Sequence, residues 1–203
     1  MERIASRIVS RMLLADLISD RETDEYAYEI QVLLEKVVSY VVIFGLAILF
    51  NRLLEIALFT ISFSLIRKYS GGIHCRSFGT CLVASIAVSF SSVIMFPLFA
   101  EIYPTYQGGA TVSMIIVILI GSVNNPNIDW SDYEYRRVKQ ISRLIVVMEA
   151  AVLLLLVVLE APLSVRFFIS YGIVMCAMSM LLEIRKKGGV AHEEGRKAVL
   201  EGS

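Results

Sequence analysis

The sequence predicts an all-α fold, that of a polytopic helical membrane protein. Its 203 residues are 57% hydrophobic and only 19% charged, and the mean hydropathy of +0.70 is too high for an ordinary soluble domain. About six apolar segments follow one another along the chain, separated by short polar segments. We therefore expect a single integral membrane domain over residues 1–203, with four to six spans.

Residues 1–22 are predicted to form an amphipathic interfacial helix. Ile4, Ile8 and Val9 recur at helical spacing, and Arg7 lies on the opposite face. With arginine on its polar face, this helix either lies in the interface of the inner leaflet or docks on its own protein.

The membrane segments are expected within residues 37–182. The apolar segments are approximately 37–50, 53–66, 81–100, 110–123, 144–159 and 163–182. Only the third and sixth reach the ~20 residues that a helix needs to cross a ~30 Å hydrocarbon core, so the others must extend, tilt or thin the bilayer. A charged turn precedes the first segment, and Thr23 or Asp24 is expected to cap its helix. In an alternative with four spans, residues 37–66 form a shallow hairpin.

Lys and Arg residues are distributed unevenly between the polar segments. Under a six-span arrangement, 17 of the 19 belong to one side, in residues 1–36, 67–80, 124–143 and the tail 183–203. Arg52 and Arg166 fall on the other side, whose longest predicted loop, 101–109, has no cation. By the positive-inside bias, both termini and the 67–80 loop are expected to be cytoplasmic. The formal net charge is zero, so no nucleic-acid partner is expected.

His74 and Cys81 are the residues most suggestive of chemistry. Seven residues of unbroken helix would separate them by ~10.5 Å along the axis, whereas a base must come within about 3 Å of the thiol that it deprotonates. Gly71-Gly72 before His74, and the turn-forming residues 77–79 after it, permit a bend. We therefore expect a helix to begin near residues 77–80, with His74 folded back over it.

Cys81 would then lie in the first turn of that helix. The positive end of the helix dipole, together with Arg67, Lys68 and Arg76, would favour thiolate over thiol and make the sulfur nucleophilic. Cys176 lies deep in an apolar segment and is expected to be a packing residue.

The alternatives to a nucleophile are a packing cysteine and a zinc site. His74, Cys75 and Cys81 supply three possible ligands, but no fourth ligand and no catalytic metal signature are evident. We therefore expect neither a metal nor another cofactor. Glu149, an ionisable residue inside the fifth apolar segment, either orients His74 or pairs with Arg143.

At these residues the chain resembles the accessory gene regulator B (AgrB) proteins, membrane cysteine endopeptidases of bacterial peptide quorum sensing. The family pattern is an Arg, a Gly-Gly pair, a His and a Cys seven residues beyond it, here Arg67, Gly71-Gly72, His74 and Cys81. The similarity extends over the whole length of the chain. Cys75 departs from the small residue common in the family, and residues 135–139 correspond only loosely to its Lys-rich loop.

The resemblance implies a function in a bacterial cell membrane, linked to virulence regulation. A small AgrD-like precursor peptide would lose its C-terminal part while the remainder is held as a thioester, and ring closure to a thiolactone or lactone would follow. Cys81 would be the nucleophile, and His74 first the base and then the acid. The substrate-binding residues would be Arg67, Gly72, Arg136, Arg137 and Lys139.

These binding roles differ in kind. Arg67 would anchor an acidic part of the peptide or raise the thiolate population, whereas Gly72 would permit the bend. Arg136, Arg137 and Lys139 would attract an acidic tail, although a purely topogenic role explains them equally well. Small residues in short spans favour helix association, so a homodimer is expected.

The alternative function is that of a non-enzymatic membrane protein, a small transporter or sensor component. His74 and Cys81 would then only line a cytoplasmic vestibule. A substrate path would need polar residues near the middle of the bilayer, and the third and sixth segments offer only serines there.

Overall fold

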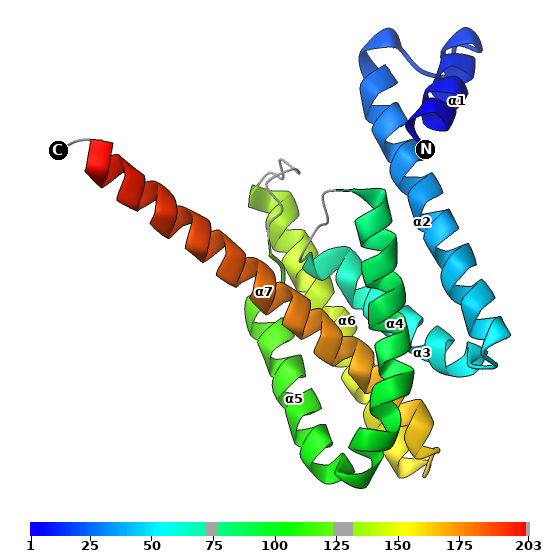
Figure 1. The fold of residues 1–203 in the computed structure, drawn as a ribbon, viewed down its shortest axis with the longest axis vertical. Helices are drawn as coiled ribbons and strands as arrows, with labels where there is room; N and C mark the ends of the chain where they lie inside the picture. Colours follow the sequence, from blue (N-terminus) through cyan, green and yellow to red (C-terminus); the bar gives the residue numbers. More distant parts are fainter. Residues whose placement is uncertain (72–76, 124–131, 202–203) are drawn as a thin grey trace.

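A computed structural model describes residues 1–71, 77–123 and 132–201 of the chain; the side chains of Asp132 and of residues 187–201 lie outside this description. These ranges contain helices and no strand, which confirms the predicted all-α class (Figure 1). The elements are α1 (Glu2–Leu14), the short 3-10 helix η1 (Asp20–Glu22), α2 (Thr23–Leu49), α3 (Leu53–Ser70), α4 (Phe78–Glu101), α5 (Tyr103–Ile120), α6 (Asp132–Val158) and α7 (Leu163–Glu201).

Five helical segments of the described ranges are long and apolar enough to cross a membrane. They are Asp20–Leu49, Phe78–Glu101, Tyr103–Ile120, Tyr133–Val158 and Leu163–Lys186. The sixth predicted segment is α3, which carries Glu55, Arg67 and Lys68 within 18 residues. In Figure 1, α3 leads the chain back from the lower end of α2 toward the end at which α4 begins. The multi-pass class predicted from the sequence is therefore confirmed.

The N-terminal helix docks on the protein itself. α1 packs against α2, and its Ala5 and Val9 are almost fully buried. Ile4 remains half exposed, as does Ile8 on the same face. The predicted amphipathic pattern is thus used in part for packing, and α1 and the start of α2 project beyond the other helices (Figure 1).

Ser19 rather than Thr23 or Asp24 caps the entry to the first span. The backbone N–H and the hydroxyl of Ser19 both donate to a carboxylate oxygen of Glu22, at 3.0 and 2.7 Å. This is a capping box, in which a Ser and a Glu three residues later satisfy the orphan groups of a helix start. The predicted cap was wrong because η1 places the first turn of the helix before Thr23.

α3 and α7 cross at the centre of the bundle. Gly172 of α7 allows the approach, because a Cβ atom there would lie 2.7 Å from the Ser62 hydroxyl oxygen and 2.9 Å from the backbone nitrogen of Phe63. Buried apolar residues surround this crossing, with Ile66 on α3 and Ile173 on α7 fully buried. The crossing fixes the end of α3 relative to α7.

The predicted loop at 101–109 is wrong. α4 ends at Glu101 and α5 begins at Tyr103, with a proline accommodated in its first turn. Tyr106 is buried, and its ring centroid lies 4.9 Å from that of Phe167 on α7. Aromatic packing, which the polar sequence of this segment does not reveal, therefore continues the helix where a loop was expected.

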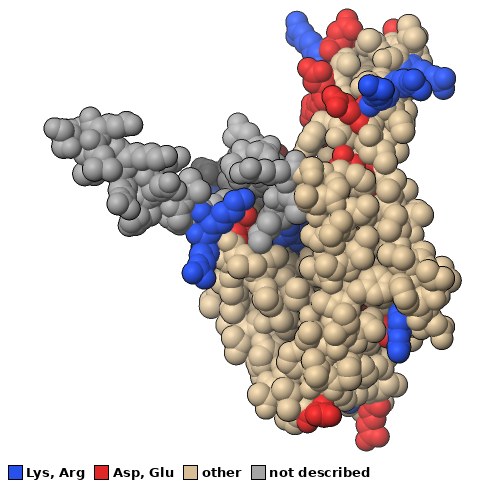
Figure 2. All heavy atoms as spheres, viewed as in Figure 1, with Lys and Arg blue, Asp and Glu red and all other residues tan. Residues whose placement is uncertain are grey.

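Charged side chains gather toward the two ends of the molecule. Figure 2 shows a broad band of uncharged side chains between them on the visible face. The points at which the chain enters and leaves residues 72–76 and 124–131 lie toward the same end of the bundle as α1 (Figure 1). α7 continues without interruption through the predicted tail as far as Glu201.

Candidate functional site

Cys81 lies in the first turn of α4, as predicted. The helix begins at Phe78, and Ser77 is its N-cap, with a hydroxyl that accepts from the backbone N–H of Thr80 at 3.4 Å. The backbone N–H of Cys81 donates to the carbonyl of Ser77 at 3.1 Å, which is the first bond of the helical ladder. The Cys81 thiol is exposed, whereas the thiol of Cys176 is fully buried in the core, as expected.

An anion at this position is stabilised by the end of the helix. The first N–H groups of a helix have no partner within it and carry the positive end of its dipole. A thiolate on Cys81 would lie in that field, on a side chain that solvent or a peptide can reach. This is the local environment in which a reactive cysteine is usually found.

His74 and Gly72 lie outside the described residues. So do Cys75 and Arg76, and the predicted approach of His74 to Cys81 stays a prediction, as does the zinc alternative. The structure does describe the two points from which this segment departs, Gly71 at the end of α3 and Ser77 at the start of α4.

Gly71 turns the chain out of α3. Its φ of +71° lies in the region that favours glycine, and a Cβ atom there would lie 2.4 Å from the carbonyl oxygen of Val123. Ser70 also contacts this neighbour, because its carbonyl accepts from the backbone N–H of Val123 at 2.8 Å. The bend that the glycine pair predicted is therefore present at Gly71, and the segments 72–76 and 124–131 depart from adjoining points.

Arg67 supports the same corner from within α3. Its guanidinium donates to the carbonyl of Gly71, one turn later, and to the hydroxyl of Ser179 on α7 at 3.1 Å. Ser70 lies within 3.1 Å of the Cys176 sulfur. Arg67 thus holds the end of α3 onto α7, a contact that its predicted role in anchoring a peptide did not anticipate.

The three predicted basic residues of α6 have different surroundings. Arg136 and Arg137 are exposed. Lys139 is half-buried, and its aliphatic stem lies over Gly121, where a Cβ atom would be 2.3 Å from the Lys139 Cγ. Two cations are therefore available to a partner at this end of the bundle, whereas Lys139 also covers the end of α5.

Glu149 does not pair with Arg143, so that alternative is wrong. Arg143 donates to the carbonyls of Ile118 and Leu119 at the end of α5, at 2.7 and 3.2 Å. Glu149 is 9% exposed and accepts from the Ser62 hydroxyl at 2.6 Å, across the interface of α3 and α6. The other carboxylate oxygen of Glu149 has no hydrogen-bond partner among the described residues.

Sequence reasoning missed Ser62 as the partner of Glu149 and Val123 as the neighbour of Ser70. Both are pairings between helices far apart in the chain, and neither residue type stands out in its own segment. The signal that could have indicated the second pairing is the glycine before each departing segment, at positions 71 and 121, both of which have positive φ.

Comparison with known proteins bears on the whole of this arrangement. A model of the family "Accessory gene regulator B" matches residues 1–184. An AgrB-like protein of Clostridium perfringens (strain SM101 / Type A) is 33% identical over 85 residues, and an AgrB-like protein 2 of Clostridium perfringens (strain 13 / Type A) is 31% identical over 85 residues. Each match covers 41% of this chain and 40% of the relative, so the chain spans less than half the length of the relatives it matches. No solved structure matches the chain significantly.

Proposed function

Because the chain belongs to the accessory gene regulator B family, we propose that it is a membrane-embedded cysteine endopeptidase that processes a small precursor peptide of quorum sensing. The observation that carries the proposal is the exposed Cys81 thiol in the capped first turn of α4. A sulfur placed there is both accessible and stabilised as an anion by the helix end.

The first half of the reaction forms a thioester. His74 accepts the proton of the Cys81 thiol, and the thiolate attacks the carbonyl carbon of the scissile peptide bond. An S–C bond forms, the C–N bond of the amide breaks, and the imidazolium of His74 returns its proton to the leaving amine. The C-terminal part of the peptide departs, and the N-terminal part stays bound to Cys81.

The second half of the reaction closes the ring. An internal Cys or Ser of the bound peptide attacks the thioester carbon, its S–C or O–C bond replaces the bond to Cys81, and a thiolactone or lactone is released. Hydrolysis competes with this step. A site at the bilayer edge favours cyclisation, because it excludes water and keeps the internal nucleophile close to the acyl group.

The surroundings of Cys81 supply supporting roles. Gly71 and Gly72 would let His74 return toward Cys81, and Arg67 would keep the end of α3 in place while its charge favours the thiolate. Arg136 and Arg137, exposed at the same end of the bundle, would attract an acidic tail of the peptide, with a smaller contribution from Lys139.

The proposed topology places this end of the bundle in the cytoplasm. The support is the cation distribution, since all but Arg52 and Arg166 belong to the side of the His74 segment. We further propose that the protein acts as a homodimer in a bacterial cell membrane.

The test is co-expression with a neighbouring small precursor peptide, with cleavage followed by mass spectrometry. Cys81→Ala and His74→Ala should each abolish cleavage at unchanged expression, whereas Cys176→Ala and Cys75→Ala should retain it. The peptide N-terminal fragment should also be found attached to the wild-type protein, as a thioester that hydroxylamine releases. Cleavage by Cys81→Ala would overturn the proposal and leave the non-enzymatic alternative.

A further inference from the structure

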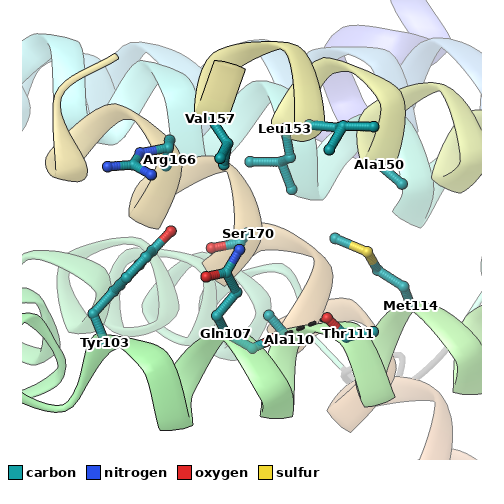
Figure 3. Close-up of a pocket in the computed structure, with 11 residues that line it drawn as sticks. Tyr103, Gln107, Ala110, Thr111, Met114, Ala150, Leu153, Val157, Arg166 and Ser170 are labelled. Atoms are coloured by element: carbon teal, nitrogen blue, oxygen red, sulfur yellow. Dashed lines mark hydrogen bonds between the residues drawn. The ribbon is translucent and has the colours of Figure 1, made fainter. Parts of the chain in front are cut away.

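A polar-ended cleft lies at the end of the bundle opposite Cys81. It has a volume of about 200 Å³ and is bounded by the start of α5, the second half of α6 and the start of α7. Figure 3 shows Arg166 and Tyr103 at one end of the cleft and Met114 and Ala150 at the other, with Gln107 and Ser170 between them. The cleft therefore joins a cationic end to an apolar end.

Arg166 has no anionic partner in the part of the chain that the structure describes. Its guanidinium lies over the ring of Tyr103, 5.6 Å from the centroid, and its Nε is buried without a hydrogen-bond partner. A buried donor without an acceptor is unfavourable, and the planar guanidinium presents its donors in a fork that matches two oxygens of a phosphate or carboxylate.

Arg52, the other cation predicted at this side, has its charge satisfied within the protein. It makes an ion pair of 3.1 Å with Glu55, one turn later on the surface of α3. The unmet demand for an anion is therefore specific to the cleft and is not a general property of this end of the molecule.

The apolar wall of the cleft opens toward the lipid. Leu154 of α6 lines it while remaining 66% exposed, and Val157, also on the wall, is 37% exposed. Both residues belong to a helix long and apolar enough to cross the membrane, so their exposed faces meet acyl chains. The volume is below the roughly 300–1,000 Å³ of pockets that enclose drug-sized ligands, so the cleft suits a headgroup better than a cyclic peptide.

We propose that this cleft binds the headgroup of an anionic phospholipid from the leaflet opposite Cys81. The phosphate oxygens accept from the Arg166 guanidinium, the amide of Gln107 and the hydroxyl of Tyr103 reach the polar part of the headgroup, and an acyl chain follows the wall at Leu154. The inference is independent of the proposed peptidase activity.

The test measures lipid binding to the full-length, delipidated protein in detergent. Phosphatidylglycerol, phosphatidylcholine and inorganic phosphate are added separately, and bound lipid is read by native mass spectrometry together with the shift in unfolding temperature. Wild type should retain phosphatidylglycerol in preference to phosphatidylcholine, and inorganic phosphate alone should give little shift.

The variant Arg166→Gln should weaken phosphatidylglycerol binding about tenfold, the loss expected when a hydrogen bond to a charged group is removed. Arg52→Gln, which removes the same charge from the same end, should bind as wild type. Thr111→Phe fills the mouth of the cleft from an exposed position and should weaken binding while leaving Arg166 in place. This second variant keeps the test decisive if Arg166→Gln fails to fold.

Four results would overturn the proposal. They are equal retention of phosphatidylcholine, unchanged phosphatidylglycerol binding in either cleft variant, an equal shift with inorganic phosphate alone, and Arg166-dependent displacement of the lipid by a cyclic peptide product. The last two would assign the cleft to a free anion or to the peptide.

Discussion

The backbone N–H of Val123 donates a hydrogen bond of 2.8 Å to the carbonyl oxygen of Ser70. This bond joins the end of α3 to the segment that follows α5, although 53 residues separate them in the chain. The next residue, Gly71, faces the carbonyl of Val123 so closely that no side chain fits. The segment that carries His74 therefore departs from a corner that is fixed by backbone contacts on two helices.

Substitution of Gly71 tests this corner. Gly71→Ala should lower the stability by more than about 1 kcal/mol, because alanine is strained at positive φ and its Cβ would collide with a backbone oxygen that cannot move independently. Cleavage of the precursor peptide should fall with it. Thermal unfolding in detergent and the co-expression assay measure the two effects.

The matched control is Gly45→Ala in α2, where a Cβ atom would meet nothing within 4 Å. This variant should unfold within about 1 kcal/mol of wild type, the usual range for Gly-to-Ala exchange in a helix. Equal stability and equal cleavage for the two alanine variants would show that the corner at Gly71 is unimportant.

Thiol labelling tests the accessibility and side of Cys81. In a Cys75→Ala background, a membrane-impermeant maleimide should label inverted membrane vesicles at one position and leave intact cells unlabelled. Cys81 is exposed and, under the proposed topology, cytoplasmic, whereas Cys176 is fully buried. Cys81→Ser should remove the label and Cys176→Ser should not. Labelling of intact cells would contradict the topology.

The sequence predicted the helices better than the contacts between them. Apolarity and length identify membrane helices because the bilayer imposes both on every span, and local capping chemistry placed the start of α4 within one residue of Ser77. The same local reasoning was wrong at Ser19, where the capping box begins before the charged turn, and at Tyr103, where aromatic burial extends α5.

The partners of polar groups could not be read from the sequence. Arg143 and Glu149 lie within two helical turns of each other, which made an ion pair plausible, yet each finds a partner on a different helix. Which groups meet depends on how α3, α5 and α6 pack, and periodicity within one helix does not contain that information. The partner of His74 is a question of the same kind.

The contact between Ser62 and Glu149 is expected to be structural. Ser62→Ala removes the hydroxyl that donates to a buried carboxyl group, so the stability should fall by about 1–3 kcal/mol. Glu149→Gln keeps an acceptor at this position and should retain cleavage. Ser113→Ala, which removes a hydroxyl bonded to the backbone of its own helix, is the control and should be nearly neutral in thermal unfolding. Loss of cleavage in a stable Glu149→Gln protein would instead support a role in orienting His74.

The exposed pair Arg136 and Arg137 is expected to act on peptide affinity and not on the chemical step. The double variant Arg136→Gln/Arg137→Gln should raise KM for a peptide with an acidic tail by about three- to tenfold at low ionic strength, with kcat unchanged, because rim charges attract a ligand through water. The difference from wild type should shrink as salt is added, since screening weakens exposed charges first.

The control for this pair is Arg185→Gln/Lys186→Gln, which removes the same charge from exposed positions near the cytoplasmic end of the α7 span. Initial rates of cleavage in vesicles, measured against peptide concentration, separate KM from kcat. A fall in kcat with KM unchanged would place the arginines in the chemistry. An equal rise in KM for both double variants would mean that the overall charge of this end attracts the peptide, and that Arg136 and Arg137 have no specific role.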